Sequence, residues 1–241
     1  MSTGTGHESS LHRALKFRYA GEGETEIIRG SYVCDGLSPA GELIEVQTGS
    51  FGPLKAKIPE LVKSGKVRII HPIITRKIIE RYDPAGTLIS RRTSPRKGTI
   101  WDLFKVLIYA PDLPLLEDLV IELALVETEE RRIRDGRGSW RRGGDSIVDR
   151  ILTRYGESVS LIRPADYRLF VPFRDGESFT VKELGERARI PTAIARKTLY
   201  VLTRIDLVER IEKRGNSWVY RIRRSRKKTA TAKKTTKGKR T

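Results

Sequence analysis

The sequence predicts an α/β (α+β) protein in which a mixed sheet flanked by helices precedes a smaller unit of two helices and a strand pair. At 8–19, apolar residues recur every three or four positions, which is typical of an amphipathic helix. Between 26 and 73, apolar strand-length segments surround one helical segment, an order that favours a crossover and a mixed sheet. At 178–222, two capped helical segments precede two short apolar strands.

The first part of the chain divides into short elements separated by glycine- and proline-containing turns. The glycines at 21 and 23 end the first helix, the SPAG turn at 38–41 joins two strands, and the DPAG turn at 83–86 joins two more. The predicted order is a helix at 8–19, strands at 26–28, 31–37 and 42–47, a helix at 52–63, strands at 67–73, 77–82 and 87–92, a helix at 99–110 and a long strand at 119–133.

The charge balance predicts a polyanionic partner. Lysine and arginine outnumber aspartate and glutamate by 48 to 30, which gives a formal net charge of +18. Ten of the basic residues and none of the acidic ones fall at 223–241. Because this tail has no apolar anchors, we expect it to be disordered and to add salt-dependent affinity that does not depend on sequence.

The cysteine count and hydropathy favour an intracellular protein. Cys34 is the only cysteine, so no internal disulfide can form, which fits a reducing compartment. No apolar run approaches the ~18 residues that a membrane span needs. Residues 1–10 lack the basic and apolar regions of a secretion signal. We therefore expect a cytoplasmic, nucleoid-associated protein without a membrane partner, and nothing in the sequence supports a metabolic role.

Two carboxylates on neighbouring predicted strands suggest a magnesium site. If the turn centres on residue 40, Asp35 and Glu45 stand opposite each other on one face of the sheet. Two such carboxylates repel unless a cation lies between them, and Mg²⁺ suits a few carboxylate oxygens and several waters. A metal held there activates water and stabilises phosphate charge. Gln47 is then placed to orient water or phosphate, and Glu8 is a candidate third carboxylate.

The residues YVCD at 32–35 and LIEVQT at 43–48, followed by the predicted helix at 52–63, resemble the PD-(D/E)XK nuclease superfamily. The similarity covers roughly residues 7–75. It is nearest to the archaeal Holliday-junction-resolvase-like branch and to uncharacterised bacterial proteins. The resemblance implies a restriction-endonuclease-like core, Mg²⁺-dependent cleavage of DNA and a homodimer. It also implies metal binding by Asp35 and Glu45, with assistance from Glu8 and Gln47.

Two departures from that motif leave an alternative open. Cys34 occupies the proline position, and Gln47 replaces the lysine, a change also found in inactive members of the superfamily. Cations on neighbouring helices are candidates to replace the lysine charge, namely Lys16, Lys55 and Lys57. A lone Asp with Glu-x-Gln also occurs by chance on solvated strands, so an inactive nuclease-like scaffold in a DNA-binding protein stays the second hypothesis.

The three histidines do not predict a metal site of their own. His12 is expected to pack or to support a site residue rather than to act as a base. His71, inside an apolar strand, is expected to be a buried histidine with its hydrogen bonds satisfied. Three scattered histidines and one cysteine do not form a zinc site. Because no glycine-rich loop with Lys-Ser/Thr is present, motor activity driven by nucleotides is not expected.

The C-terminal third resembles a winged helix-turn-helix. Thr180 is expected to cap the first helix with Glu183 as its reciprocal partner, and Thr192 to cap a second helix that runs to about 205. Strands at 207–211 and 218–222 flank a basic turn, which corresponds to the wing. The resemblance implies that the second helix enters the DNA major groove. The candidate DNA-binding residues are Arg189, Thr192, Arg196 and Lys197 on the helices and Lys213, Arg214 and Asn216 on the wing.

These predictions divide the chain into four segments. We expect a nuclease-like domain at 7–135, a basic linker and lead-in segment at 136–177, a winged-helix domain at 178–222 and the disordered tail at 223–241. Winged helices also mediate protein contacts, so that role is the alternative for the third segment. The basic wing and exposed helix face favour a phosphate-bearing partner.

Overall fold

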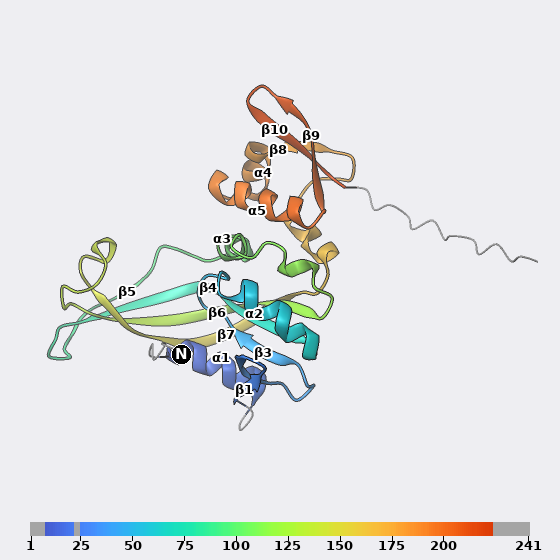
Figure 1. Ribbon diagram of the computed structural model, residues 1–241. Helices are drawn as coiled ribbons and strands as arrows, with labels where there is room; N and C mark the ends of the chain where they lie inside the picture. The colour runs from blue at the N-terminus through green and yellow to red at the C-terminus, as the bar shows by residue number, and fades with distance from the viewer. Residues whose placement is uncertain (1–7, 22–24, 224–241) are drawn as a thin grey trace, which may run out of the picture.

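The computed structural model describes residues 8–21 and 25–223. A large mixed sheet carries helices on both faces, and a smaller unit with its own sheet lies beyond one of these helical layers (Figure 1). The predicted mixed sheet flanked by helices is thereby confirmed. The basic tail at 224–241 lies outside the described residues. Within the described chain, no helix combines the length and apolar character of a membrane span.

The elements follow the predicted order closely up to residue 64. The helices are α1 (Ser10–Ala20), α2 (Leu54–Leu61), α3 (Leu103–Leu107), α4 (Val181–Ala188) and α5 (Thr192–Arg204). The large sheet contains β1 (Thr25–Arg29), β2 (Tyr32–Leu37), β3 (Leu43–Val46), β4 (Val67–Tyr82), β5 (Leu88–Thr93), β6 (Leu119–Ile133) and β7 (Ser146–Leu161). The small sheet contains β8 (Ser178–Thr180), β9 (Val208–Arg214) and β10 (Ser217–Ile222).

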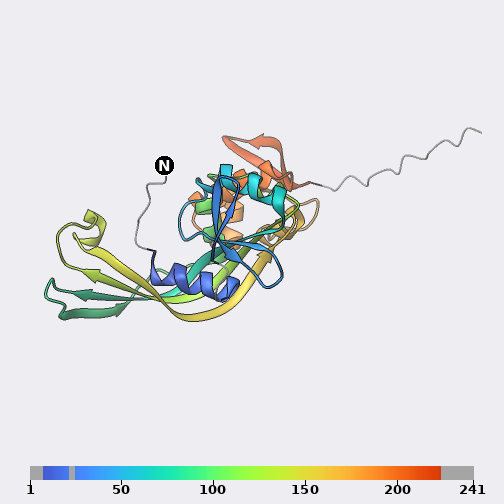
Figure 2. The same ribbon diagram turned by 60° about the horizontal axis from the view of Figure 1, so that its bottom comes forward.

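The large sheet has the order β1-β2-β3-β4-β6-β7, and β5 pairs with the outer part of β4. Strand β4 runs parallel to both β3 and β6, whereas the remaining pairs are antiparallel. Helix α1 covers one face, where Leu11 and Leu15 pack on Ile44, Val46 and Ile70. The other face carries α2 and α3 over the larger apolar core (Figures 1 and 2).

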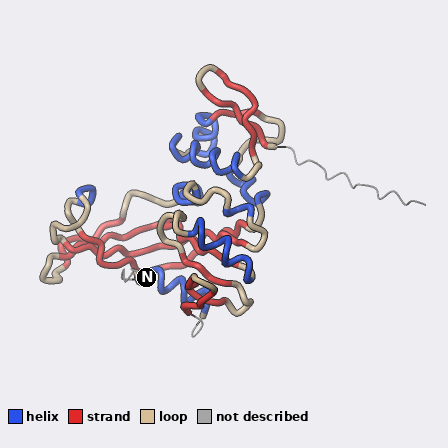
Figure 3. The backbone as a smooth tube through the Cα atoms, in the orientation of Figure 1, coloured by secondary structure: helices blue, strands red, loops and turns tan. Residues whose placement is uncertain are grey.

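The four strands β4 to β7 continue past the helices as a long projection (Figures 1 and 3). We call this projection the arm and define it as residues 76–96 and 127–154. Where the sequence predicts two strands at 67–73 and 77–82, the structure has the single strand β4 with a register shift between Ile74 and Arg76. This bulge lets one strand cross from the apolar body into the charged arm.

Strand β7 is the main departure from the predicted domain division. The sequence assigns 136–177 to a basic linker and lead-in segment. In the structure, β7 pairs with β6 along the whole arm and is the edge strand of the large sheet. Much of β7 is exposed or half-buried, so its sequence has no regular apolar alternation that would predict a strand. The segment Pro164–Phe170 is also not a free linker, because Tyr167 and Phe170 are buried in the larger core.

The C-terminal unit packs directly on the large-sheet unit. Helices α4 and α5 lie against the small sheet, and α5 also packs on α3. One continuous apolar core joins Phe104 of α3, Phe170, and Leu199 of α5. At the C-terminal end of α5, Arg204 forms an ion pair with Asp112 at 2.7 Å. The two units therefore share a core and form one body.

Candidate active site and nucleic-acid surface

Glu45 is a buried carboxylate paired with a lysine from the following helix. All four residues of β3 are buried because α1 and α2 cover the two faces of the sheet. Leu54, Ile58 and Leu61 form the buried stripe of α2, which places Lys57 at the edge of that stripe. Its Nζ lies 2.6 Å from each oxygen of Glu45, which is 7% exposed. Burial raises the pKa of Glu45 although the Lys57 charge opposes that shift.

Asp35 is held by a backbone amide and a histidine. Its Oδ2 accepts a hydrogen bond from the backbone N–H of Val46 at 2.7 Å, and its Oδ1 lies 3.2 Å from Nε2 of His12. Burial alone would raise the Asp35 pKa, but these two contacts lower it. Burial opposes charge on His12, yet the contact with Asp35 raises the pKa of His12. Glu8 lies 3.5 Å from the same nitrogen of His12.

Together these groups form one electrostatic cluster, which we call the carboxylate cluster: Glu8, His12, Asp35, Glu45 and Lys57. The Asp35 charge raises the pKa of Glu45, and the Lys57 charge lowers the pKa of Asp35. The structure thus brings three of the four predicted catalytic residues into one neighbourhood. Of the three candidate lysines, Lys57 contacts Glu45, whereas Lys16 pairs with Glu26 at 3.8 Å and Lys55 is exposed.

The two central carboxylates do not share a strand face in the way the sequence predicts. The ladder between β2 and β3 ends at the pair Gly36–Ile44, and beyond it the Asp35 side chain takes the ladder position by bonding the Val46 amide. Asp35 therefore contacts α1 through His12, while Glu45 contacts α2 through Lys57. The two carboxylates are therefore held by helices that cover opposite faces of the sheet.

Gln47 turns away from the carboxylate cluster. Its side-chain amide donates to the carbonyl of Ser50, and its own carbonyl accepts from Nδ1 of His71 at 2.6 Å. His71 is buried against the ring of Phe51, and burial lowers its pKa. The prediction of a satisfied buried histidine is confirmed. The structure shows no contact between Gln47 and either central carboxylate.

The donor chemistry of the carboxylate cluster suits a hard cation, but only two carboxylates are central to it. Asp35 and Glu45 offer the oxygen ligands that Mg²⁺ prefers, and water completes its coordination in many sites. Across residues 8–21 and 25–223, no three aspartate, glutamate, histidine or cysteine side chains converge closely enough to hold a metal ion. His12 and Lys57 compensate the two charges, so a bound cation must compete with them.

The predicted nucleic-acid residues of the C-terminal unit lie at its surface. Thr180 and Glu183 form the expected capping box of α4. Pro191, rather than Thr192, is the N-cap of α5, and Thr192 is the first helical residue. Most of the predicted contacts are exposed and Lys197 is half-buried; the exposed ones are Arg189, Thr192, Arg196, Lys213, Arg214 and Asn216. On the wing, Lys213 lies 5.2 Å from the ring centroid of Trp218.

A basic cleft that the sequence did not predict leads from the large sheet to the start of α5. Two adjoining hollows of about 250 and 430 Å³ share Arg96, Asp102 and Lys105. The first extends to Thr48, directly after β3, and the second to Arg189 before α5. The only signal in the sequence was the cationic character of 91–105, and only the fold shows that these residues line a hollow.

Comparison with known proteins places the large sheet in a family. Residues 9–162 match the family described as "Domain of unknown function (DUF8091)". The chain belongs to the DUF8091 family. The DUF8091 match ends directly after β7, so it includes α1, the arm and all of the carboxylate cluster except Glu8, and it leaves out the C-terminal unit.

One relative extends the similarity to the C-terminal unit. An uncharacterized protein of Treponema pallidum (strain Nichols) is 28% identical over 224 residues, which are 92% of this chain and 88% of that protein. No solved structure matches the chain. The similarity to the Treponema protein therefore extends well beyond the DUF8091 region.

Proposed function

We propose that this protein is a Mg²⁺-dependent nuclease that acts on DNA, with a core similar to the PD-(D/E)XK superfamily. The observation that carries the proposal is Lys57, whose Nζ lies 2.6 Å from both oxygens of buried Glu45 beside the Asp35–His12 pair. Two carboxylates and a cation are the charges that a phosphodiester hydrolase needs. A lysine from α2 supplies the charge that the superfamily takes from the strand.

Each residue of the carboxylate cluster has a role in this proposal. Asp35 and Glu45 would hold Mg²⁺, which supplies activation of water and stabilisation of phosphate charge when bound. Lys57 would donate to a phosphate oxygen as negative charge develops there. His12 fixes the orientation of Asp35 through the 3.2 Å contact, and Glu8 supports His12 from the preceding residues.

Plasmid nicking tests this proposal. With Mg²⁺ present, the purified protein is expected to nick supercoiled plasmid, and EDTA is expected to stop the reaction. Glu45→Ala removes one proposed metal ligand and should abolish nicking while gel-shift affinity stays unchanged. The matched control is Glu60→Ala on the exposed side of α2, which removes only a surface pair with Lys63 and should nick normally. Equal nicking by Glu45→Ala and wild type would contradict the assignment.

We also propose that the C-terminal unit is a winged helix that delivers DNA to the carboxylate cluster. The support is the exposed basic face of α5 together with the basic wing turn. Because α5 also packs on α3, only its remaining exposed side, which carries Arg196 and Tyr200, is open to a groove. The basic cleft that reaches Arg189 offers a path for the phosphate backbone.

Substitution on α5 tests the delivery role. In a chain truncated after residue 222, Arg196→Ala with Lys197→Ala is expected to weaken duplex binding about thirtyfold or more, because two lost groove contacts at about 1–3 kcal/mol each cost at least about 2 kcal/mol. Fluorescence anisotropy at fixed salt measures the effect. Lys182→Ala, which removes one positive charge from the exposed side of α4, is the control for a general charge effect and should change little. Unchanged affinity in the double variant would show that DNA does not contact this face of α5.

A non-catalytic DNA-binding protein is the second candidate, and one observation favours it. Asp35 and Glu45 bond toward different helices, and each is already compensated by a protein cation. Ion pairs that only stabilise the fold have the same arrangement. This alternative predicts normal gel shifts and no nicking of duplex, branched or single-stranded DNA at any Mg²⁺ concentration. The homodimer and the nucleoid association stay predictions from the sequence.

A further inference from the structure

The arm has more basic than acidic residues, so its internal ion pairs do not balance all of its positive charge. Across 76–96 and 127–154, the sequence has fourteen basic and eight acidic residues. The loop between β6 and β7 carries four of the basic residues and two of the acidic ones, and the rest of the arm carries the other ten basic and six acidic residues. Both the strands and the tip loop of the arm therefore carry an excess of positive charge.

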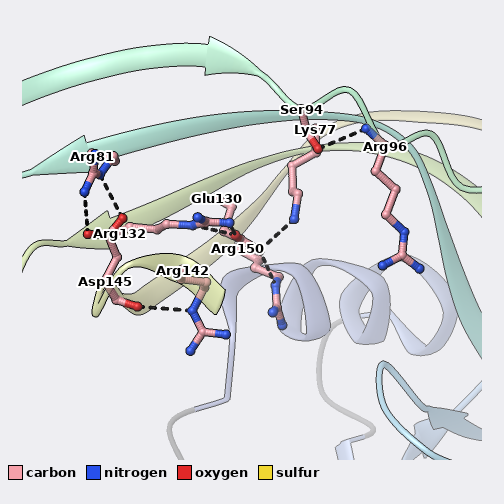
Figure 4. A network of polar contacts seen from close by, with 9 residues as sticks. All are labelled: Lys77, Arg81, Ser94, Arg96, Glu130, Arg132, Arg142, Asp145 and Arg150. Atoms are coloured by element: carbon pink, nitrogen blue, oxygen red, sulfur yellow. Dashed lines mark hydrogen bonds and ion pairs between the residues drawn. The ribbon is translucent and has the colours of Figure 1, made fainter. Parts of the chain in front are cut away.

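Buried carboxylates hold the inner part of the arm together. Glu130 is 1% exposed and contacts Lys77 at 3.2 Å, Arg132 at 2.6 Å and Arg150 at 3.0 Å (Figure 4). Burial opposes the ionised form of Glu130, but these cations lower its pKa to about 2. Asp145, equally buried, pairs with Arg81 at 2.8 Å. These contacts link three strands and the tip loop into a rigid support.

The tip of the arm gathers the cations that have no such partner. Four arginines lie at the tip, Arg134, Arg137, Arg141 and Arg142, and none of their guanidinium groups forms an ion pair with a carboxylate of the described residues. The Arg137 backbone N–H donates to Asp135 at 3.0 Å, and Arg142 Nε donates to the Asp145 carbonyl at 3.1 Å. Trp140 stands among them with 83% of its surface exposed, and the Arg141 guanidinium lies 5.4 Å from its ring centroid. We call these five residues the tip cluster.

The tip loop is closed by its own backbone, so the tip cluster is presented from a defined structure. The Gly138 amide donates to the Gly144 carbonyl at 2.8 Å. A Cβ at Gly138 would lie 1.7 Å from the Asp145 carbonyl oxygen, so only glycine permits this close approach. The exposed indole is therefore carried by a loop whose conformation is fixed by backbone contacts.

The middle of the arm adjoins the start of α1, beside the carboxylate cluster. The Ser10 amide at the start of α1 donates to Asp149 of β7 at 2.9 Å. A hollow of about 710 Å³ lies between these elements and is lined by Glu8, Arg13, Asp149 and Arg150. Glu8 belongs to the carboxylate cluster and Arg150 to the arm, so a polyanion lying along the arm reaches the candidate site.

We propose that the arm binds DNA that carries unpaired bases next to a duplex, with the tip arginines on phosphates and Trp140 stacked on an unpaired base. This proposal rests on the proposed function and specifies its substrate class. Arginines alone would serve any phosphate backbone, but an exposed indole among them matches sites where single-stranded bases stack on aromatic rings. Fully paired DNA covers its base faces, so it gains little from Trp140.

Binding of an overhang-bearing duplex tests the arm. The full chain is titrated in EDTA, so that nothing is cleaved, against a labelled duplex with a single-stranded overhang and against the same duplex fully paired. Trp140→Ala is expected to weaken overhang binding about tenfold, since base stacking on an aromatic ring is lost, and to leave duplex binding unchanged. Trp140→Phe should retain most of the affinity. A 2-aminopurine in the overhang should be quenched by wild type and not by Trp140→Ala.

Matched controls separate the arm from the proposed function. Ile89→Ala, at an exposed apolar position of β5 on the same arm, should leave overhang binding unchanged. Arg141→Ala should weaken it more than Arg154→Ala, because Arg154 is shared with Glu127 across the sheet. Wild-type affinity in Trp140→Ala, with DNA binding otherwise intact, overturns the arm proposal alone. If wild type binds neither DNA, both proposals are wrong.

Discussion

Replacing Glu130 by glutamine is expected to lower the free energy of unfolding by about 3–5 kcal/mol, the usual cost of removing one partner from a buried ion pair. The carboxylate is 1% exposed and compensates Lys77, Arg132 and Arg150 at the same point. Without it, three partly buried cations repel one another and lose their common partner. Urea denaturation followed by circular dichroism measures the loss.

The same carboxylate gives the stability a defined pH dependence. Its pKa falls from 4.5 to about 2 on folding, so its stabilising effect is complete above the unfolded value and is lost as pH falls from 4.5 towards 2. The difference between wild type and Glu130→Gln should therefore shrink in acid. Glu127→Gln, which removes a more exposed pair with Arg76, should cost less than about 1 kcal/mol. Equal losses for the two variants would contradict the buried-pair account.

Replacing Phe104 by alanine is expected to cost about 3–5 kcal/mol, the range for removing a fully buried aromatic ring. Phe104 is 0% exposed, and its ring centroid lies 4.7 Å from that of Phe170 and 6.4 Å from that of Trp101. Because α3 lies between the large sheet and α5, this loss should weaken both units at once.

Cooperativity is the sharper readout of Phe104→Ala. In wild type, circular dichroism and the fluorescence change on unfolding should give one coincident transition, because one core spans both units. Tyr109→Ala, at an exposed position just after α3, is the control and should leave the midpoint nearly unchanged. Two separate transitions in the wild type would show that the units unfold independently and would contradict the shared core.

The elements around the carboxylate cluster were predictable from sequence because their patterns are local. The spacing of Leu11 and Leu15 marks α1, and short apolar runs between turn residues mark β2 and β3. Lys57 was only one of three candidate lysines in the sequence, because whether a helix side chain contacts a strand residue depends on how the helix packs. The end of the β2–β3 pairing at Gly36 could not be predicted from the alternation of apolar residues.

The arm and the shared core were not predictable for a different reason. Where both faces of a sheet are open to solvent, its strands need no apolar alternation. In β7 and the outer half of β6, charged residues therefore occupy many positions. Their pairing depends on cross-strand ion pairs such as Glu127 with Arg154. The apolar residues of α5 predict a buried helix face but not which element covers it, so the contact with α3 required the structure.

The parallel pairing of β4 with β6 also sets the order in which the chain acquires its fold. Val67 aligns with Leu119, so this pairing cannot form until about half of the chain has been made, and the Ser10–Asp149 contact, which spans 139 positions, must wait longer. While the ribosome is still producing β7, helix α1 lacks one of the strands on which it packs, and β6 lacks its outer neighbour. Such distant pairings slow folding, and the nascent chain must wait with its apolar strands uncovered.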